Sequence, residues 1–258
     1  MDRNTVDREG VRLSYLESGS GDPALLFIHG WCCDATHWRK QLAALDGDHR
    51  VLALDLRGHG ESAKPDQDYT IDEFAEDMGW LCQELALERP VIVGHSMGGV
   101  IALNMVRRWP QLARAVVFVD AGITPFPKQF RPMVDSMIEA LKSPGYRDVA
   151  ADFVRRFLFR AESPPQLRDE VAQRMAGAPQ RVMHTALTSS FSEENLTFGP
   201  LSVPSLFVRA ATLRTTEDEL KERYPGMEVV SVDSAHFIQL EKPEELNAIL
   251  RRFIEALW

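Results

Sequence analysis

The chain has 258 residues, of which 45% are hydrophobic, so it can bury a full core within one α/β domain. Its 29 basic and 38 acidic residues give a net charge of −9, and such a surface repels nucleic acid and anionic membranes. No apolar run is long enough to span a membrane, and no signal-peptide pattern follows Met1. With only three cysteines, we expect a cytoplasmic protein without a disulfide framework.

Short apolar runs alternate with apolar residues at helical spacing along most of the chain. This alternation predicts a mostly parallel sheet with helices on both of its faces. The expected strands are residues 5–7, 11–17, 24–28, 51–54, 90–93, 115–119, 205–208 and 228–232. The expected helices cover residues 36–45, 71–85, 100–109, 149–159, 165–175 and 243–257.

Residues 125–197 break this pattern, because they are rich in Phe, Met, Arg and Pro and contain no convincing strand. We interpret them as a helical lid inserted into a core of residues 1–124 and 198–258, above the carboxyl ends of the strands. The apolar side chains in this stretch indicate an apolar substrate, although any single one can serve only to pack the lid. They are Phe126, Phe130, Met133, Met137, Phe153, Phe157 and Phe159.

The sequence GHSMG at residues 94–98 is the most informative segment, because it follows the apolar run 90–93 directly and leads into a helix. This is the G-x-S-x-G pattern of a nucleophile elbow. A sharp strand-to-helix turn exposes the hydroxyl of Ser96, and the helix start supplies N–H donors for a developing oxyanion. Close packing at the turn requires residues without bulk, and Gly94 and Gly98 flank the serine. The pattern predicts that Ser96 is a nucleophile rather than a plain helix cap.

Four motifs together resemble the α/β-hydrolase family, and the resemblance covers almost all of the chain outside the lid. They are HGW at 29–31, DLRGHGES at 55–62, GHSMGG at 94–99 and SAHF at 234–237. The resemblance implies an eight-stranded sheet whose second strand is antiparallel. It also implies that Ser96 is the nucleophile, that His236 is the general base, and that the backbone N–H groups of Trp31 and Met97 form the oxyanion hole.

Other polar and sulfur-containing residues near these motifs are interpreted as structural. We expect His29 to brace the loop that carries Trp31, His95 to point away from the turn, and Cys32 and Cys33 to line the pocket. No pattern for a metal ligand set is present, and no cofactor is implied, because the expected chemistry needs only water.

The acid of the triad is where the sequence departs from the family. The family supplies it after the strand at 205–208, and Leu213 stands at that position. Asp120, at the end of the strand 115–119, is the replacement we favour, since some relatives, including certain dehalogenases, take their acid from there. Neighbouring strand ends lie about 5 Å apart, so this exchange is geometrically reasonable. Two alternatives stay open. The loop after the strand can fold back over the sheet so that Glu217 or Asp218 serves as the acid, or the triad has no working acid.

Three functions fit this pattern. The first is a serine hydrolase that cleaves an ester, thioester or lactone of a small molecule through an acyl-enzyme. The second uses the same triad for carbon–carbon bond hydrolysis or cofactor-free perhydrolysis. The third is a signal-binding protein with slow turnover, favoured only by the missing loop carboxylate. A serine at the elbow argues against dehalogenase and epoxide hydrolase chemistry, for which the family uses aspartate.

Overall fold

The structure is a computed structural model that describes residues 1–212 and 215–257, without the side chain of Phe130. Within these residues, eight strands form one sheet in the order β1-β2-β4-β3-β5-β6-β7-β8. Strand β2 is antiparallel to both of its neighbours, and all other pairs are parallel. The strands are β1 (Asp2–Arg8), β2 (Val11–Ser18), β3 (Leu25–Ile28), β4 (Val51–Asp55), β5 (Val91–His95), β6 (Ala115–Val119), β7 (Ser205–Ala210) and β8 (Glu228–Val232).

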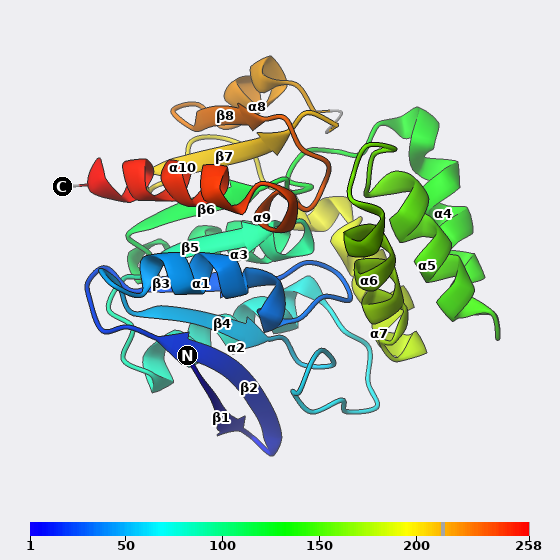
Figure 1. The fold of residues 1–258 in the computed structure, drawn as a ribbon, viewed down its shortest axis with the longest axis horizontal. Helices are drawn as coiled ribbons and strands as arrows, with labels where there is room; N and C mark the ends of the chain where they lie inside the picture. Colours follow the sequence, from blue (N-terminus) through cyan, green and yellow to red (C-terminus); the bar gives the residue numbers. More distant parts are fainter. Residues whose placement is uncertain (213–214, 258) are drawn as a thin grey trace.

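The predicted mostly parallel sheet with helices on both faces is confirmed (Figure 1). Helices α1 and α10 lie on one face, and α2 and α3 lie on the other. The α-helices are α1 (Arg39–Leu45), α2 (Ile71–Glu84), α3 (Met97–Arg108), α4 (Arg131–Ala140), α5 (Tyr146–Phe157), α6 (Pro165–Ala176), α7 (Gln180–Ser190), α8 (Glu217–Arg223), α9 (Ile238–Glu241) and α10 (Pro243–Glu255). The 3₁₀ turns are η1 (Ala35–Trp38), η2 (Pro110–Leu112), η3 (Lys128–Phe130) and η4 (Glu193–Asn195).

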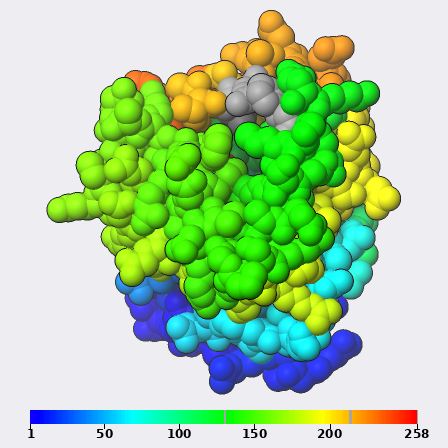
Figure 2. Space-filling view, turned by 90° about the vertical axis from the view of Figure 1, so that its right-hand side faces the viewer, coloured from blue at the N-terminus to red at the C-terminus, as the bar shows by residue number. Residues whose placement is uncertain are grey.

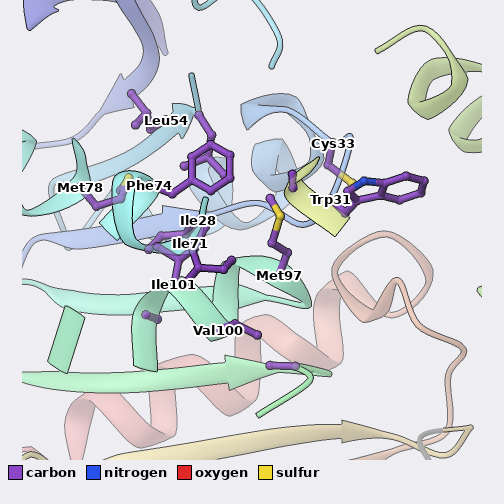
Figure 3. Close-up of a cluster of buried hydrophobic side chains, with 14 of the residues drawn as sticks. Ile28, Trp31, Cys33, Leu54, Ile71, Phe74, Met78, Met97, Val100 and Ile101 are labelled. Atoms are coloured by element: carbon purple, nitrogen blue, oxygen red, sulfur yellow. The ribbon is translucent and has the colours of Figure 1, made fainter. Parts of the chain in front are cut away.

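The buried strands divide their side chains between two apolar clusters, as the two-residue period of a strand requires. In β3, Leu25 and Phe27 face the cluster formed with α1 and α10, whereas Leu26 and Ile28 face the cluster formed with α2 and α3. Figure 3 shows part of the second cluster, in which Ile28 lies near Ile71 and Ile101. The central strands are therefore buried on both faces, and this holds their carboxyl ends in fixed positions.

Helices α4 to α7 all come from the segment between β6 and β7, and they stand beyond the carboxyl ends of the strands (Figure 1). In the described part of residues 125–197 no strand is present. Viewed from that side, the green and lime atoms of this helical insertion cover the centre of the molecule (Figure 2). Among the described residues, no helix is both long and apolar enough to cross a membrane.

Candidate active site

Ser96 lies at the junction between β5 and α3 in a backbone conformation that side chains rarely adopt. Its φ of 53° and ψ of −119° fall in a sparsely populated region, and such strain persists only where the surrounding structure enforces it. The side chain makes no capping bond to α3, so Ser96 is not an ordinary helix cap. Its neighbours His95 and Met97 are buried, whereas Ser96 is partly exposed. The turn therefore presents the hydroxyl at the surface of a cavity.

Two glycines allow this turn to pack, because a side chain at either position would collide with the neighbouring backbone. A Cβ added to Gly94 would collide with the carbonyl oxygen of Gly98, and a Cβ added to Gly98 would collide with that of Ile28. The second of these contacts lies on β3, beside the elbow strand. The spacing of the two glycines around Ser96 thus follows from the tight path of the backbone between β3 and α3.

Asp120 and His236, which are 116 residues apart in the sequence, are joined by a hydrogen bond of 2.7 Å between Oδ2 and Nδ1. Asp120 directly follows β6 and is only 3% exposed. Its other oxygen, Oδ1, accepts the backbone N–H of Ala210 on β7 at 2.8 Å. An ionised carboxylate only accepts, so Nδ1 of His236 donates and carries the proton of the neutral ring. Nε2 is then left with its lone pair available.

His236 lies between β8 and α9, in a loop held at several points. The Oε2 atom of Glu241 accepts hydrogen bonds from Ser234 Oγ at 2.8 Å and from the N–H of Ala235 at 2.7 Å. His95 Nε2 donates to the carbonyl oxygen of His236 at 3.0 Å, and the two rings lie 4.6 Å apart. Burial and the neighbouring His236 lower the pKa of His95 well below its usual value, so His95 stays neutral. These contacts fix the backbone that carries the imidazole of His236.

The two residues expected at the oxyanion hole flank the elbow. Met97 is the first residue of α3, so its backbone N–H has no acceptor within the helix. The loop that carries Trp31 passes close to the serine, because a Cβ built on Gly30 would lie 3.2 Å from the Cβ of Ser96. In Figure 3 the side chains of Trp31 and Met97 both lie at the end of the apolar cluster nearest the insertion. The geometry brings both residues to the same cavity as Ser96.

A cavity of about 540 Å³ lies between the strand ends and the helical insertion. Ser96, Asp120 and His236 line it from the core side. Its insertion side is mostly apolar, although Lys128, Arg131, Asp152 and Glu193 add charge. The apolar lining residues from this side are Pro125, Phe126, Pro127, Met133, Val134, Met137, Val149, Phe153, Phe157, Leu158, Met175, Leu187, Phe191 and Leu196.

Most of the apolar residues expected to face a substrate do line this cavity, with two exceptions. Phe159 instead stacks on Phe237, with ring centroids 5.2 Å apart, and so packs the insertion onto the core. The side chain of Phe130 lies outside the described part of the structure. Cys33 lines the cavity as expected, whereas Cys32 is buried but does not belong to the lining.

The alternative acids do not approach His236 in the structure. Glu217 and Asp218 occupy the first turn of α8, where Thr216 caps the helix, and Glu217 Oε1 pairs with Lys221 at 2.5 Å. Leu213, at the position from which the family supplies its acid, lies outside the described residues. Asp120 is the carboxylate that contacts the ring of His236.

The sequence did not predict the contacts that two residues make near the site. The Glu241 carboxylate that holds the histidine loop follows His236 by five positions, and this short spacing was the only available signal. The indole Nε1 of Trp31 donates to the carbonyl oxygen of Met183 on α7 at 2.8 Å, so Trp31 also ties the core to the insertion. His29, as expected, braces its loop, since its Nδ1 bonds to Gly30 O and its Nε2 to Leu56 N.

Comparison with known proteins identifies the family. Residues 23–243 match the family described as the alpha/beta hydrolase fold, and the chain therefore belongs to that family. The chain is 27% identical to "Bifunctional epoxide hydrolase 2" of Sus scrofa over 96% of its own length, and it spans only 54% of that relative. It is also 27% identical to "Haloalkane dehalogenase" of Sphingobium indicum, covering 99% of this chain and 96% of that protein.

A solved structure extends the comparison to the whole fold. A thermophilic esterase from Thermogutta terrifontis superposes with a TM-score of 0.84 at 21% identity, covering 100% of this chain and 99% of that one. The chain thus belongs to the alpha/beta hydrolase superfamily, and proteins named as an epoxide hydrolase and a haloalkane dehalogenase are among its relatives.

Proposed function

We propose that this protein is a serine hydrolase that cleaves a carboxylic ester, thioester or lactone of a small, apolar substrate through an acyl-enzyme at Ser96. One observation carries the proposal. Ser96 is held partly exposed at a strained turn, in a cavity also lined by His236, whose Nδ1 donates to Asp120. A hydroxyl, a ring nitrogen with a free lone pair and a buried carboxylate are the parts that acyl transfer requires.

In the first half-reaction the Ser96 hydroxyl attacks the carbonyl carbon of the substrate while Nε2 of His236 takes its proton. The ring becomes positively charged, and Asp120, held by the backbone of β7, stabilises that charge without moving. Negative charge develops on the carbonyl oxygen, where the N–H groups of Trp31 and Met97 donate to it. In other serine hydrolases the loss of one such donor lowers the rate by about 10²–10³.

Collapse of this intermediate releases the alcohol or thiol, which receives the proton held by His236, and leaves the acyl group on Ser96. Water then repeats the sequence. It gives a proton to Nε2, attacks the acyl carbon, and the serine leaves as the free hydroxyl. No cofactor takes part in these steps, because each needs only a proton carrier and hydrogen-bond donors.

We propose that residues 125–197 act as a lid that selects the acyl or alcohol part of the substrate. The apolar side chains of α4 and α5 face the cavity, and Phe157 is 54% exposed at its mouth. An apolar substrate that leaves water for such a cavity gains about 25 cal/mol for each Å² buried. The partner we propose is a small molecule, because the cavity has a volume of about 540 Å³. The net charge of −9 gives no reason to expect nucleic acid or a membrane as a partner.

The elbow residue separates this chemistry from that of the two curated relatives named above. Attack by a serine hydroxyl on an epoxide or on a haloalkane carbon would form an ether, which water does not cleave under mild conditions. Attack on a carbonyl carbon forms an ester, which the same histidine can hydrolyse. The Asp120 contact to His236 also favours an enzyme over a slow binding protein, since it supplies the carboxylate absent from the family's usual position.

A series of p-nitrophenyl esters with increasing acyl length tests this proposal. We expect release of p-nitrophenol with an initial burst that approaches one equivalent of enzyme, followed by slower turnover that declines once the acyl chain exceeds the cavity. The matched control is Ser96→Ala, which should release no more product than a solution without protein. Equal release by the wild-type protein and this variant would overturn the proposal.

A further inference from the structure

Two threonine side chains meet on the core side of the cavity. Thr124 lies in the segment that follows β6, and Thr215 lies between the neighbouring strand β7 and helix α8. Their hydroxyl oxygens are 2.7 Å apart, so the two groups share a hydrogen bond. Both residues line the cavity that Ser96 also lines. The mechanism proposed above gives these two hydroxyl groups no role.

The hydrogen bond between the threonines leaves one of their two protons unused. Either oxygen can be the donor, and in both arrangements the accepting hydroxyl keeps a proton of its own. Neither hydroxyl has another partner among the residues that the structure describes. Thr124 is only 8% exposed, and a donor left unpaired in such a place is costly. The pair can therefore donate a hydrogen bond to a molecule that occupies the cavity.

Hydrogen bonds from two other side chains hold the backbone of the pair in place. The hydroxyl of Tyr224, which is 0% exposed, donates to the carbonyl oxygen of Ile123 at 2.5 Å, directly before Thr124. Nε of Arg209 on β7 donates to the carbonyl oxygen of Thr215 at 2.8 Å. A donor whose position is fixed in advance loses little freedom on binding. The pair is thus suited to distinguish one substrate from another.

Ser190 on α7 is a cavity-lining hydroxyl in a different state. Its Oγ donates to the carbonyl oxygen of Ala186, one turn earlier in the same helix, at 2.7 Å. A serine hydroxyl has a single proton, so Ser190 has none left for a ligand. It therefore provides a matched contrast to the threonine pair.

The charges around the cavity favour an uncharged partner for the free proton. Among the described residues of the lining, the three carboxylates of Asp120, Asp152 and Glu193 stand against the two cations of Lys128 and Arg131. An anionic group would meet an excess of negative charge. An ether or carbonyl oxygen accepts the hydrogen bond without bringing a charge out of water.

We propose that the Thr124–Thr215 pair selects substrates that carry an uncharged acceptor oxygen, such as an ether or a carbonyl, in addition to the group that is cleaved. This inference rests on the proposed function, since it names the substrate class of the same cavity. The apolar wall holds the hydrocarbon part of the substrate, and the pair donates to its oxygen. A substrate of equal size with a methylene group in place of that oxygen leaves the donor unpaired. The expected preference in kcat/KM is about threefold to tenfold.

Esters of matched size test the pair. The p-nitrophenyl ester of hexanoic acid is compared with those of 4-methoxybutanoic, 3-ethoxypropanoic and propoxyacetic acid, in each of which oxygen replaces one methylene group. A second series makes the same replacements in the alcohol part of hexyl acetate. The intrinsic reactivity of each ester is the same for every variant, so a change in the ether-to-alkyl ratio between proteins reports on the pair.

We expect the ratio for at least one ether to fall by about threefold to tenfold in the double variant Thr124→Val/Thr215→Val, checked for folding by circular dichroism. The double variant Thr124→Ser/Thr215→Ser keeps both hydroxyl groups and should retain the wild-type ratio. Ser190→Ala, which removes a hydroxyl whose proton is already used, should retain it as well.

Binding of the corresponding amides to Ser96→Ala, measured by calorimetry, separates this proposal from hydrolysis. The affinity ratio of ether to alkyl amide should exceed one and should fall when the two valines are added. If the wild-type protein hydrolyses none of the esters, the proposed function fails, and the affinity ratios still decide the role of the pair.

Three results would overturn the inference. The first is an ether-to-alkyl ratio that is the same in the folded double valine variant for both ester series and for the amides. The second is an equal fall in Ser190→Ala. The third is tighter binding of the monoanilide of glutaric acid than of any neutral anilide, which would show that the site takes an anion.

Discussion

The sheet core and the helical insertion of residues 125–197 contribute to the cavity in different ways. The core holds its polar groups through backbone atoms of neighbouring strands, as Asp120 shows by bonding to Ala210 on β7. The insertion supplies mainly apolar side chains from amphipathic helices. One such side chain can be replaced by another without loss of a hydrogen bond. The proposed reacting groups and the proposed substrate wall are therefore built by separate parts of the chain. Changes in one should therefore alter rate, and changes in the other selectivity.

The two parts meet at a few polar contacts near the site. Trp31 donates to Met183 O on α7, and His236 N–H donates to Leu158 O at 3.3 Å. Arg174 on α6 pairs with Asp34 at 2.8 Å. These contacts join the insertion to the loops that carry Trp31 and His236, so a change in the insertion at these points can also displace residues of the core.

The largest effect is expected at the core carboxylate. Asp120→Asn keeps the size of the side chain but removes the charge that stabilises the imidazolium and fixes its tautomer. We expect kcat for every p-nitrophenyl ester to fall by about a hundredfold or more, toward the 10⁴ of the serine-protease template. The matched controls are Glu217→Gln and Asp218→Asn on α8, which should retain activity. A loss in either control equal to that of folded Asp120→Asn would show that the acid has been assigned wrongly.

Glu241 tests how strongly the loop of His236 must be held. Removal of its two hydrogen bonds in Glu241→Ala should lower kcat by about ten- to a hundredfold with little change in KM, because the imidazole is displaced and the substrate wall is untouched. Glu241→Gln keeps an acceptor oxygen and should lose less. The exposed Glu244, at the start of α10, gives the control variant Glu244→Ala. An increase in KM without loss of kcat would argue against a positioning role.

Phe153 tests the insertion side of the comparison. Its ring lies on α5, lines the cavity and makes an edge contact with Trp31 at a centroid distance of 6.2 Å. Phe153→Ala should enlarge the cavity and shift the ratio of kcat/KM between long and short acyl esters by about tenfold toward the longer ones. The same ratio should be unchanged in Asp120→Asn. If both variants shift it equally, rate and selectivity are not separable in this molecule.

Acid should destabilise the core more than the insertion. Burial lowers the pKa of His29, His59 and His95, that of His59 to about 3, so the folded state leaves these rings neutral. The unfolded chain protonates them below about pH 6.5, so the stability they contribute is present above that pH and falls below it; for His59 the loss approaches about 1.4 kcal/mol per pH unit between pH 6.5 and about 3. His37 does not offset this loss, because it is charged in both states at acidic pH.

Urea unfolding between pH 5 and 7 measures this slope. His59→Gln should flatten it by up to about 1.4 kcal/mol per pH unit near pH 5 and by little near pH 7. The control is His184→Gln on α7, whose ring is half-buried and should contribute less. Identical slopes for the two variants and the wild-type protein would contradict a core origin of the acid sensitivity.

The core could be predicted from the sequence because its physical causes are local. Apolar runs bounded by turn residues define strands such as β3 and β6, and the steric need for small residues makes the elbow recognisable at Gly94 and Gly98. The end of β7 was placed two residues too early, at 208 instead of Ala210, because the polar Arg209 interrupts its apolar run.

The contacts between distant segments could not be predicted in the same way. Asp120 was favoured as the partner of His236 only because some relatives take their acid from the end of the same strand; the residues around Asp120 do not by themselves indicate that its carboxylate meets a ring 116 residues later. The residues of the cavity wall could not be predicted from the sequence either. Whether Phe159 faces the cavity or stacks on Phe237 depends on how the insertion packs on the core. The difference between Cys32 and Cys33 depends on the path of a short loop rather than on residue type.

Labelling with a fluorophosphonate probe tests the central claim most directly, because the probe reacts only with a serine that a neighbouring base has activated. The account predicts one phosphonylated site, mapped by mass spectrometry to Ser96, that disappears in Ser96→Ala and forms much more slowly in Asp120→Asn. A folded wild-type protein that stays unlabelled at Ser96, or one labelled equally well without Asp120, would contradict it.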